Sequence, residues 1–238
     1  MTERYDTETA KHYAAYRPPL HRLILERAIQ STKSYQSGLD VGCGTGISAE
    51  ALAEVCDQVC GIDASQQMLD LAKPHPKVTY VLNAARSFEG LPGAPFEIVT
   101  FAGSLFYTKS GELRTVLNSA CCSSATVIVY DFQVLVEDLT CALGITETAE
   151  ASDYDHDLGL SDWEEFEAVA IESERLRIDV TPEEAAHVLL SDSFRYDALQ
   201  RSLGNQDLFE NLTRRLDAEE ESLFLDADIW SKRYRLLG

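Results

Sequence analysis

Short apolar runs alternate with segments of helical periodicity along the first half of the chain. The runs that predict buried strands are Leu39–Val41, Gln58–Ile62, Phe96–Ala102 and Ala125–Tyr130. Helices are expected between them, one beginning near Ile47 and another over Glu112–Cys121. Strands and helices in regular alternation predict an α/β fold.

The pattern changes after Asp131. We expect, in order, a helix over Asp138–Ala149, an acidic loop over Ser152–Ser161, a strand over Ala168–Val180, a helical stretch over Asp197–Glu220 broken near Gly204, and a last strand over Ser222–Leu237. Another helix is expected to begin after Thr181, which can cap it, with Pro182 and two acids in the first turn.

Length and composition are those of an ordinary globular chain. The 238 residues suffice for a single domain over 1–238, and 45% of them are hydrophobic against 25% charged. No apolar run approaches the ~20 residues that a bilayer-spanning helix needs. The segment Met1–Asp6 lacks a basic patch followed by an apolar core, so we expect no secretory signal and a cytoplasmic protein.

The net charge of −20 restricts the partners. Nucleic-acid binders cluster Lys and Arg along the phosphates, and an anionic membrane repels an acidic surface. We therefore expect neither nucleic acid nor a membrane as a partner.

Cysteines and histidines form no disulfide framework and no metal-ligand pattern. Cys43 lies among glycines, Cys121 and Cys122 are adjacent, and Cys56 and Cys60 are expected in one helix-to-strand turn. There is no Cys-x-x-Cys pair, and no histidine stands at ligand spacing from a cysteine. Buried free thiols and no metal site are therefore predicted.

One acidic segment matches the spacing of a calcium loop. Positions 1, 3, 5, 9 and 12 of an EF-hand would be Asp153, Asp155, Asp157, Ser161 and Glu164. Position 6 requires a sharp turn and holds Leu158 in place of glycine. A solvated acidic loop is the favoured interpretation.

The most informative motif follows the first buried strand. Gly42, Gly44 and Gly46 alternate with other residues directly after Val41. Glycines adopt positive φ at low steric cost and let a ligand approach the main chain, while the start of the next helix offers unpaired N–H groups. A second strand ends in Asp63, whose carboxylate can accept hydrogen bonds from both hydroxyls of a ribose.

The glycine spacing discriminates between nucleotide ligands. The dinucleotide fingerprint places its third glycine one position later, which disfavours a pyrophosphate, and Asp63 would repel a 2′-phosphate. An NAD-dependent oxidoreductase remains an alternative because it would share the sheet and the acid.

These residues resemble the class I S-adenosylmethionine-dependent methyltransferases over about residues 10–135, in particular their small-molecule branch. The resemblance implies a Rossmann-like, seven-stranded, mostly parallel sheet with helices on both faces and a small lid insertion. It divides the single domain into an N-terminal lid helix (about 5–30), a donor-binding core (about 36–135), an acceptor lid (about 136–162) and a strand-helix-strand part (about 163–238).

The resemblance also implies a donor site for S-adenosyl-L-methionine. Asp63 would hold the ribose, Met68 would border the adenine, and Asn83 or its neighbour Ala84 would meet the adenine amino group. The expected donor-binding residues are Tyr13, Arg17, Asp40, Gly42, Gly44, Gly46, Asp63, Ala64, Met68, Asn83, Ala84 and Ala102.

The N-terminal segment around Tyr13 is similar to a Tyr-x-x-x-Arg-Pro segment of trans-aconitate-methyltransferase-like enzymes, where it covers the donor. Tyr13 and Arg17 would share one helix face and meet the methionine carboxylate, and Pro18 would end the helix. The alternative is that Tyr13 and Tyr16 pack this helix and that Arg17 forms a surface pair.

On the acceptor side, Gly103–Tyr107 would line the methyl-transfer chamber. Acceptor contacts are expected from Phe106, Tyr107, Phe132 and Tyr154, and Trp163 would help to shape specificity unless it packs in the core with Phe166. Candidate bases are Tyr107, His12 and Tyr16. A carboxylate acceptor would prefer Arg17 or Arg195, and an amine would prefer Asp131 or Asp155.

The expected function is methyl transfer from S-adenosylmethionine to a small-molecule acceptor by direct displacement. Alignment and desolvation would supply most of the catalysis. A donor-binding regulatory protein or pseudoenzyme is the alternative, because no catalytic base is evident. The expected assembly is a monomer or a homodimer.

Overall fold

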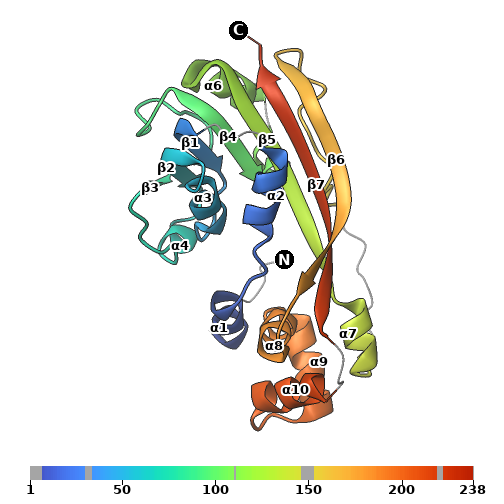
Figure 1. Cartoon of the computed structure of the whole chain (residues 1–238). Helices are drawn as coiled ribbons and strands as arrows, with labels where there is room; N and C mark the ends of the chain where they lie inside the picture. Colours follow the sequence, from blue (N-terminus) through green and yellow to red (C-terminus); the bar gives the residue numbers. More distant parts are fainter. Residues whose placement is uncertain (1–6, 30–33, 110, 146–152, 219–221, 238) are drawn as a thin grey trace. The chain divides into compact units, whose positions relative to one another are not determined.

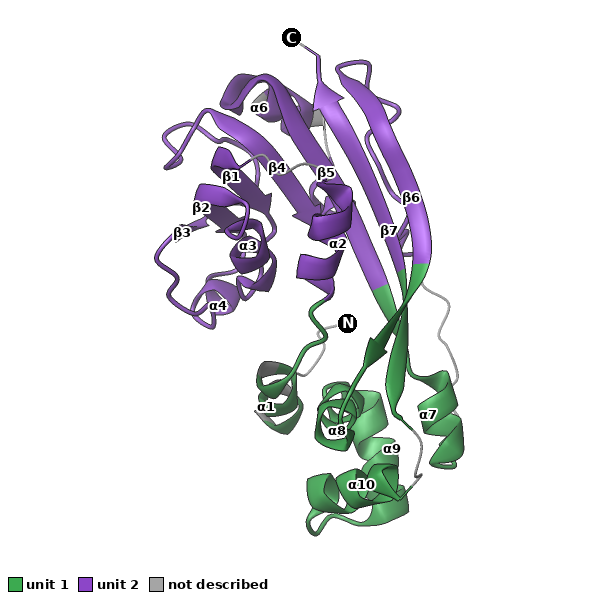
Figure 2. Ribbon diagram, in the orientation of Figure 1, with its two compact units in different colours: residues 1–19, 133–152, 175–228 green, residues 20–132, 153–174, 229–238 purple. Residues whose placement is uncertain are grey.

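The computed structural model describes residues 7–29, 34–109, 111–145, 153–218 and 222–237. They form two compact units whose segments alternate along the chain (Figure 2). Unit 1 comprises residues 1–19, 133–152 and 175–228, and unit 2 comprises residues 20–132, 153–174 and 229–238.

The elements follow one another as shown in Figure 1. The strands are β1 (Tyr35–Val41), β2 (Cys56–Asp63), β3 (Val78–Leu82), β4 (Phe96–Ala102), β5 (Cys121–Leu135), β6 (Phe166–Asp179) and β7 (Phe224–Leu236). The helices are α1 (Thr7–Ala15), α2 (Leu20–Ala28), α3 (Ile47–Leu52), α4 (Gln66–Leu69), α5 (Leu105–Thr108), α6 (Gly111–Ala120), α7 (Glu137–Ala142), α8 (Pro182–Leu190), α9 (Ser193–Leu203) and α10 (Leu208–Asp217).

All seven strands form one sheet in the order β3-β2-β1-β4-β5-β7-β6. Pairing is parallel between β1 and β2, β1 and β4, β2 and β3, and β4 and β5. The Rossmann-like architecture and the four strands expected from apolar runs are thus confirmed, and β4 has the expected bounds. The sheet brings the carboxyl ends of β1, β2, β3 and β4 to one edge, where open α/β sheets bind their ligands.

The two late strands are also confirmed, and they pair in antiparallel fashion. The amide of Leu237 donates to the carbonyl of Glu165 at 2.7 Å, and that of Val180 donates to Leu223 at 3.1 Å. In Figure 1 the arrow of β7 runs opposite to those of β5 and β6, so the sheet is mixed on this side. β6 is the edge strand, and most of its side chains are exposed.

Charged side chains connect β6 to β7. Arg175 forms two hydrogen bonds with Asp228, at 2.7 and 2.9 Å. Arg177 forms two with Asp226, at 3.0 and 3.1 Å. These side chains are exposed enough for solvent to weaken each pair, so the pairs align the two strands more than they stabilise them.

The hydrophobic core of unit 2 surrounds the central strands. Leu39, Val41, Ile62, Phe96 and Phe101 are completely buried. Strand β1 is buried along almost its whole length, as expected for a parallel strand covered on both faces. Trp163 and Phe166 belong to the same cluster, with ring centroids 5.9 Å apart, so the packing interpretation is correct for Trp163.

In unit 1 the expected helix start is confirmed. The Thr181 side chain accepts from the amide of Glu184 at 3.2 Å, and the Glu184 carboxylate accepts from the amide of Thr181 at 2.8 Å, which completes a capping box. The helical stretch over 197–220 is interrupted after Gly204 as expected, and it forms the separate helices α9 and α10.

Three expectations need correction. Cys56 and Cys60 both lie on β2, with all six cysteines free. The helix expected over Asp138–Ala149 ends at Ala142, because Gly144 adopts a φ of 75° there; residues 146–152 lie outside the described part. The N-terminal segment that was expected to form one helix over about 5–30 contains two helices, α1 and α2.

No helix in the described ranges combines the length and the apolar character needed to cross a membrane.

Candidate functional site

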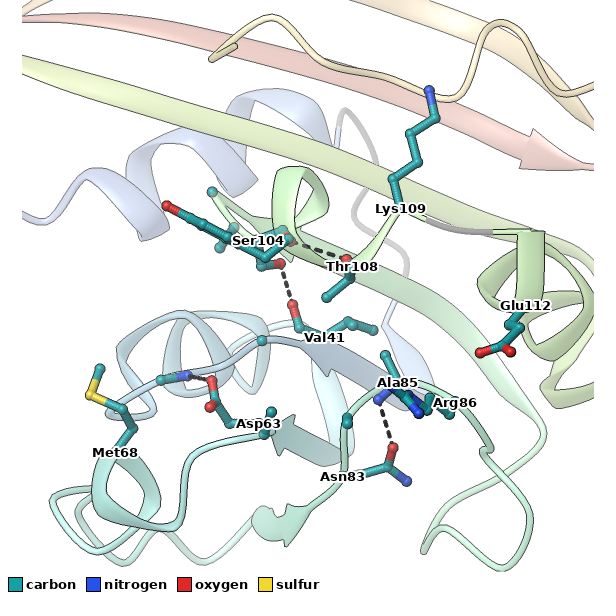
Figure 3. Close-up of a pocket in the computed structure, with 17 residues that line it drawn as sticks. Val41, Asp63, Met68, Asn83, Ala85, Arg86, Ser104, Thr108, Lys109 and Glu112 are labelled. Atoms are coloured by element: carbon teal, nitrogen blue, oxygen red, sulfur yellow. Dashed lines mark hydrogen bonds between the residues drawn. The ribbon is translucent and has the colours of Figure 1, made fainter. Parts of the chain in front are cut away.

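A cavity of about 600 Å³ opens at the carboxyl ends of four strands of unit 2 (Figure 3). Its walls follow the chain in five groups: Val41, Gly42 and Gly44 after β1; Asp63, Ala64 and Met68 after β2; Asn83–Arg86 after β3; Ala102–Ser104 after β4; and Tyr107–Lys109 with Glu112. Cavities of this size bind cofactors and small ligands.

The glycine loop is held against its neighbours too closely for side chains. Gly42 has a φ of 75°, and a Cβ there would lie 2.5 Å from the Cβ of Ser104. Gly46 has a φ of 90°, and its Cβ would lie 2.7 Å from Cζ of Tyr80. The crowding at these two positions comes from the protein itself, so they need glycine for the fold of the loop.

Gly44 differs from both of its neighbours in the loop. A Cβ at Gly44 would meet only the Cε of Met68, at 3.4 Å, and both residues line the cavity. A side chain here would therefore occupy space that is available to a ligand. Gly46 is not among the cavity-lining residues, and its expected contact with the donor stays a prediction.

Asp63 bridges the two loops at the end of β2. Its Oδ2 accepts from the amide of Gly44 at 2.8 Å and its Oδ1 accepts from the amide of Ser65 at 2.8 Å. Each carboxylate oxygen can accept a further hydrogen bond, so a vicinal diol can still bind. Asp63, Ala64 and Met68 line the cavity, as expected for a ribose and adenine site.

Asp40 is not among the residues that line the cavity, and its expected contact with the donor stays a prediction. It is completely buried, and its carboxylate accepts from Ser48 Oγ at 2.5 Å and from Thr100 Oγ1 at 2.7 Å. Burial raises the pKa of Asp40 from 3.8 to about 6, against the two hydroxyl hydrogen bonds, which lower it. Asp40 therefore supports the glycine loop from beneath.

This pKa gives a prediction for stability. The folded state holds the Asp40 proton more tightly than the unfolded state does, so between pH 4 and 6 unfolding releases a proton. The free energy of unfolding of the wild type should therefore fall as the pH rises through this range. The fall should exceed that of Asp40→Asn by about 3 kcal/mol.

Urea denaturation of both proteins at several pH values measures that difference. Other carboxyl groups cancel because they are common to the two proteins. Parallel pH profiles would contradict a buried acid with a raised pKa.

The adenine side of the cavity is formed by the loop after β3. Asn83 lines it, but the side-chain oxygen of Asn83 accepts from the amide of Ala85 at 2.8 Å (Figure 3). The Nδ2 of Asn83 donates to Ser87 O at 2.7 Å. The amide group thus shapes its own loop, which presents Ala84, Ala85 and Arg86 to the cavity.

The wall after β4 is anchored to the glycine loop. Ser104 Oγ donates to the carbonyl of Val41, and Thr108 Oγ1 donates to Ser104 O at 3.0 Å (Figure 3). Ala102 and Tyr107 line the cavity as expected, and Tyr107 is 76% exposed. Phe106 does not line the cavity, although its ring lies 5.4 Å from that of Tyr107.

The cavity wall carries two acidic and two basic side chains. The acidic residues are Asp63 and Glu112, and the basic residues are Arg86 and Lys109. Lys109 is engaged by Asp162 at 2.9 Å and by Gly159 O at 2.8 Å. The carboxylate of Asp63 is an acceptor of the kind that a ligand diol needs.

Four of the remaining predicted residues, Tyr13, Arg17, His12 and Tyr16, belong to unit 1 and are not among the residues that line the cavity. There the Arg17 guanidinium carbon lies 4.2 Å from the centroid of the Tyr13 ring, but α1 ends at Ala15, so the expected helix up to Pro18 with both residues on one face is wrong. Their contact with the donor stays a prediction.

Two of the candidate bases have other roles in unit 1. His12 Nδ1 lies 2.9 Å from His187 Nδ1, and the His12 ring stacks on Phe209 at 5.5 Å. Burial, followed by the neighbouring Glu184, raises the pKa of Tyr16, which makes a phenolate base less available.

Sequence reasoning missed a cluster beside the cavity. Asp131 Oδ2 lies 2.8 Å from the Tyr154 hydroxyl and 2.9 Å from His156 Nδ1, while Gly103 O lies 2.7 Å from the same hydroxyl. Tyr154 was expected at the acceptor, and Asp131 was considered for amines. The signal in the sequence that could have indicated this cluster was the presence of Tyr154 and His156 two residues apart in the acidic loop.

The acidic loop itself is connected to the last strand. Asp157 pairs with Lys232 at 3.0 Å, and Asp155 accepts from the amide of Asp157 at 2.9 Å. In the described part of the chain, no three or more His, Cys, Asp or Glu side chains are grouped closely enough to hold a metal ion. Phe132 packs edge-on against His21, with ring centroids 5.1 Å apart.

Comparison with known proteins agrees with this geometry. Residues 39–123 match a protein family described as a methyltransferase domain. A ubiquinone biosynthesis O-methyltransferase from Thiobacillus denitrificans is 42% identical over 67 residues, 26% of this chain and 29% of that protein. A ribosomal protein L11 methyltransferase from Burkholderia ambifaria is 41% identical over 88 residues, 34% of this chain and 27% of that protein.

The chain thus spans less than a third of the length of these two curated relatives. Among solved structures, that of a candidate type II methyltransferase from Anaeromyxobacter dehalogenans aligns with a TM-score of 0.64 at 18% identity, covering 93% of this chain and 99% of that one. The structural likeness shows that the chain has the Rossmann-like fold of that structure, and the sequence likeness to methyltransferases is concentrated in residues 39–123.

Proposed function

We propose that this protein transfers the methyl group of S-adenosylmethionine to a small-molecule acceptor. The observation that carries the proposal is the meeting of Gly44, Asp63 and Met68 around one cavity at the carboxyl edge of the sheet. Asp63 would bind the ribose diol, Met68 would lie against the adenine, and the main chain at Gly44 would approach the ligand. The bound donor supplies an activated methyl group on a positively charged sulfur.

The chain's own residues would bind and orient the reactants. Ser104 and Thr108 fix the wall after β4 through hydrogen bonds to Val41 and to Ser104 O, so the donor side of the cavity is built before a ligand arrives. Such positioning, together with exclusion of water, lowers the barrier for displacement at carbon.

The relatives support the donor more than the acceptor. The family match covers residues 39–123, which include the glycine loop and Asp63, and the curated relatives bear names with different acceptors. The name of the first relative specifies transfer to oxygen, and we include a hydroxyl acceptor in the proposal on that basis. The likeness to trans-aconitate-methyltransferase-like enzymes rests on Tyr13 and Arg17 and stays a prediction, as does a cytoplasmic location.

Isothermal titration calorimetry with S-adenosylhomocysteine and S-adenosylmethionine tests the donor site, with NADH as the competing ligand. We expect both sulfur compounds to bind and NADH to produce no heat. Methyl-labelled donor with pools of hydroxyl, amine and carboxylate acceptors then tests transfer.

Each result decides between named alternatives. Binding without transfer to any pool would favour a donor-binding regulatory protein. Absence of heat with both sulfur compounds at millimolar concentration would refute the proposed function.

A further inference from the structure

A connected group of polar side chains lies directly behind the cavity wall. Gly103 belongs to both, since it lines the cavity and its carbonyl oxygen lies 2.7 Å from the Tyr154 hydroxyl. A Cβ on Gly103 would lie 3.1 Å from Asp131 Oδ1. Gly103 therefore lies between the carboxyl group of Asp131 and the cavity in which methyl transfer would occur.

Asp131 is fixed from three directions. Its Oδ1 accepts from the amide of Phe132 at 2.8 Å, and its Oδ2 contacts the Tyr154 hydroxyl and His156 Nδ1. The side chain of Asp131 is only 16% exposed. A carboxylate held in this way can fix the orientation of the histidine that it contacts.

The contact with Asp131 determines which imidazole nitrogen carries the proton. A carboxylate only accepts hydrogen bonds, so Nδ1 of His156 must be the donor, and the neutral ring then has its lone pair on Nε2. Within the described ranges, no residue forms a hydrogen bond with Nε2 of His156. The side chain is 33% exposed, so a ligand can reach it.

Aromatic rings connect His156 to Tyr107, which lines the cavity. His156 stacks on Trp230 with centroids 5.0 Å apart and an interplanar angle of 17°, and its ring lies 4.7 Å from Tyr154. The rings of Phe106 and Tyr107 lie 4.9 and 5.9 Å from Tyr154. Such a group of partly exposed rings suits a planar aromatic ligand.

We propose that His156, oriented by Asp131, is the general base for methyl transfer to a small acceptor that carries an aromatic hydroxyl group. This inference rests on the proposed function and names the substrate class for the same site. In the step, His156 Nε2 takes the hydroxyl proton as the oxygen forms a bond to the methyl carbon; the carbon–sulfur bond breaks with both electrons going to sulfur. Asp131 stabilises the resulting imidazolium, which later loses its proton to water.

The neighbouring charges agree with a neutral acceptor. Asp131 and Asp155 are the acids that act on Tyr154, and Lys232 on β7 is paired with Asp157. The cavity wall itself adds Asp63, Glu112, Arg86 and Lys109. An acceptor carboxylate would be repelled by the acids. Tyr154 does not compete as the base, because burial and its contact with Asp131 raise its pKa well above the ordinary value.

The decisive experiment compares catechol with 4-nitrocatechol as acceptors, using methyl-labelled S-adenosylmethionine. Catechol must lose its proton during the reaction, whereas the nitro compound ionises in water at mildly alkaline pH. We expect His156→Gln to lower kcat for catechol about 100-fold and to change kcat for 4-nitrocatechol by less than about 5-fold. His75→Gln, a histidine far along the chain on the loop before β3, should match the wild type with both acceptors.

A spectroscopic measurement tests the positioning role of Asp131 independently of turnover. Ring ¹⁵N shifts of labelled His156 should show the neutral form protonated on Nδ1 in the wild type and a mixture of both neutral forms in Asp131→Asn. The same variant should lower kcat for catechol more than it changes KM.

The outcomes separate the two proposals. If the wild type binds S-adenosylhomocysteine but methylates neither catechol, or if His156→Gln slows both acceptors equally, the base and its substrate class are refuted and the donor site stands. If S-adenosylhomocysteine does not bind, the proposed function itself is wrong.

Discussion

Replacing Gly42 by alanine is expected to destabilise the protein by about 2–5 kcal/mol and to abolish donor binding. A side chain at its φ of 75° costs roughly 1–2 kcal/mol, and the new Cβ would lie 2.5 Å from the Cβ of Ser104. The melting temperature should fall by about 10 °C. Thermal unfolding followed by circular dichroism, with calorimetry against S-adenosylhomocysteine, measures both effects.

A second glycine provides the matched control. Gly90 has a nearly equal φ of 73°, but a Cβ there would meet no atom within 4 Å. Gly90→Ala should therefore show only the backbone cost, about 4 °C, and should retain donor binding.

The contribution of the clash can be isolated with a double variant. Ser104→Gly removes the atom that the new methyl group would meet, so Gly42→Ala should be less destabilising in that background by about 1–3 kcal/mol. The contact with Ser104 would have no effect if Gly42→Ala lowered the free energy of unfolding equally in both backgrounds. The same conclusion would follow if Gly42→Ala and Gly90→Ala lowered it by equal amounts.

Replacing Asp63 by asparagine is expected to weaken binding of S-adenosylhomocysteine about 100-fold. The carboxylate would make charge-assisted hydrogen bonds to the ribose diol, each contributing roughly 1.5–3 kcal/mol, and the amide keeps only one acceptor oxygen. Asp63 also accepts from the amides of Gly44 and Ser65, so the variant loosens the loops that border the ligand.

Asp57 lies on the same strand and provides the control. Its side chain is exposed and it is not among the residues that line the cavity, so Asp57→Asn changes the net charge equally without touching the site. Calorimetry should give the wild-type affinity for this variant. An Asp63→Asn protein that is folded and binds within about 3-fold of wild type would mean that Asp63 does not hold the ribose.

Several elements could be predicted because one physical signal dominates each of them. The apolar runs at Leu39–Val41 and Phe96–Ala102 predicted β1 and β4, which are buried on both faces. Thr181 and Pro182 marked the start of α8 through local capping chemistry. Strand β3 has only five residues, all partly or fully exposed, so hydrophobicity did not reveal it.

The donor half of the site could be predicted for a related reason. The loop glycines and Asp63 lie at the carboxyl ends of adjacent parallel strands. Their positions along the chain therefore suffice to predict that they lie close together. Asp40 was also assigned to the ligand, but it is not among the residues that line the cavity. Side chains alternate along a strand, and the side chain of Asp40 is directed to Ser48 and Thr100 inside the protein.

His156 and Asp131 could not be paired from the sequence. The two residues are joined only when the loop before β6 returns to the end of β5, and nothing in the local pattern of either segment determines that return. The acids around His156 also matched calcium-loop spacing, which directed attention to the carboxylates and away from the imidazole.

The charged outer strand β6 also affects how copies of the protein meet one another. A terminal strand offers unpaired peptide groups to any extended chain, and two such strands from separate molecules could join. Glu167, Glu172 and Glu174 lie along this strand, so self-association in that way would bring acids against acids or require the arginine pairs with β7 to break. Charged side chains along β6 are therefore expected to disfavour aggregation through the sheet edge.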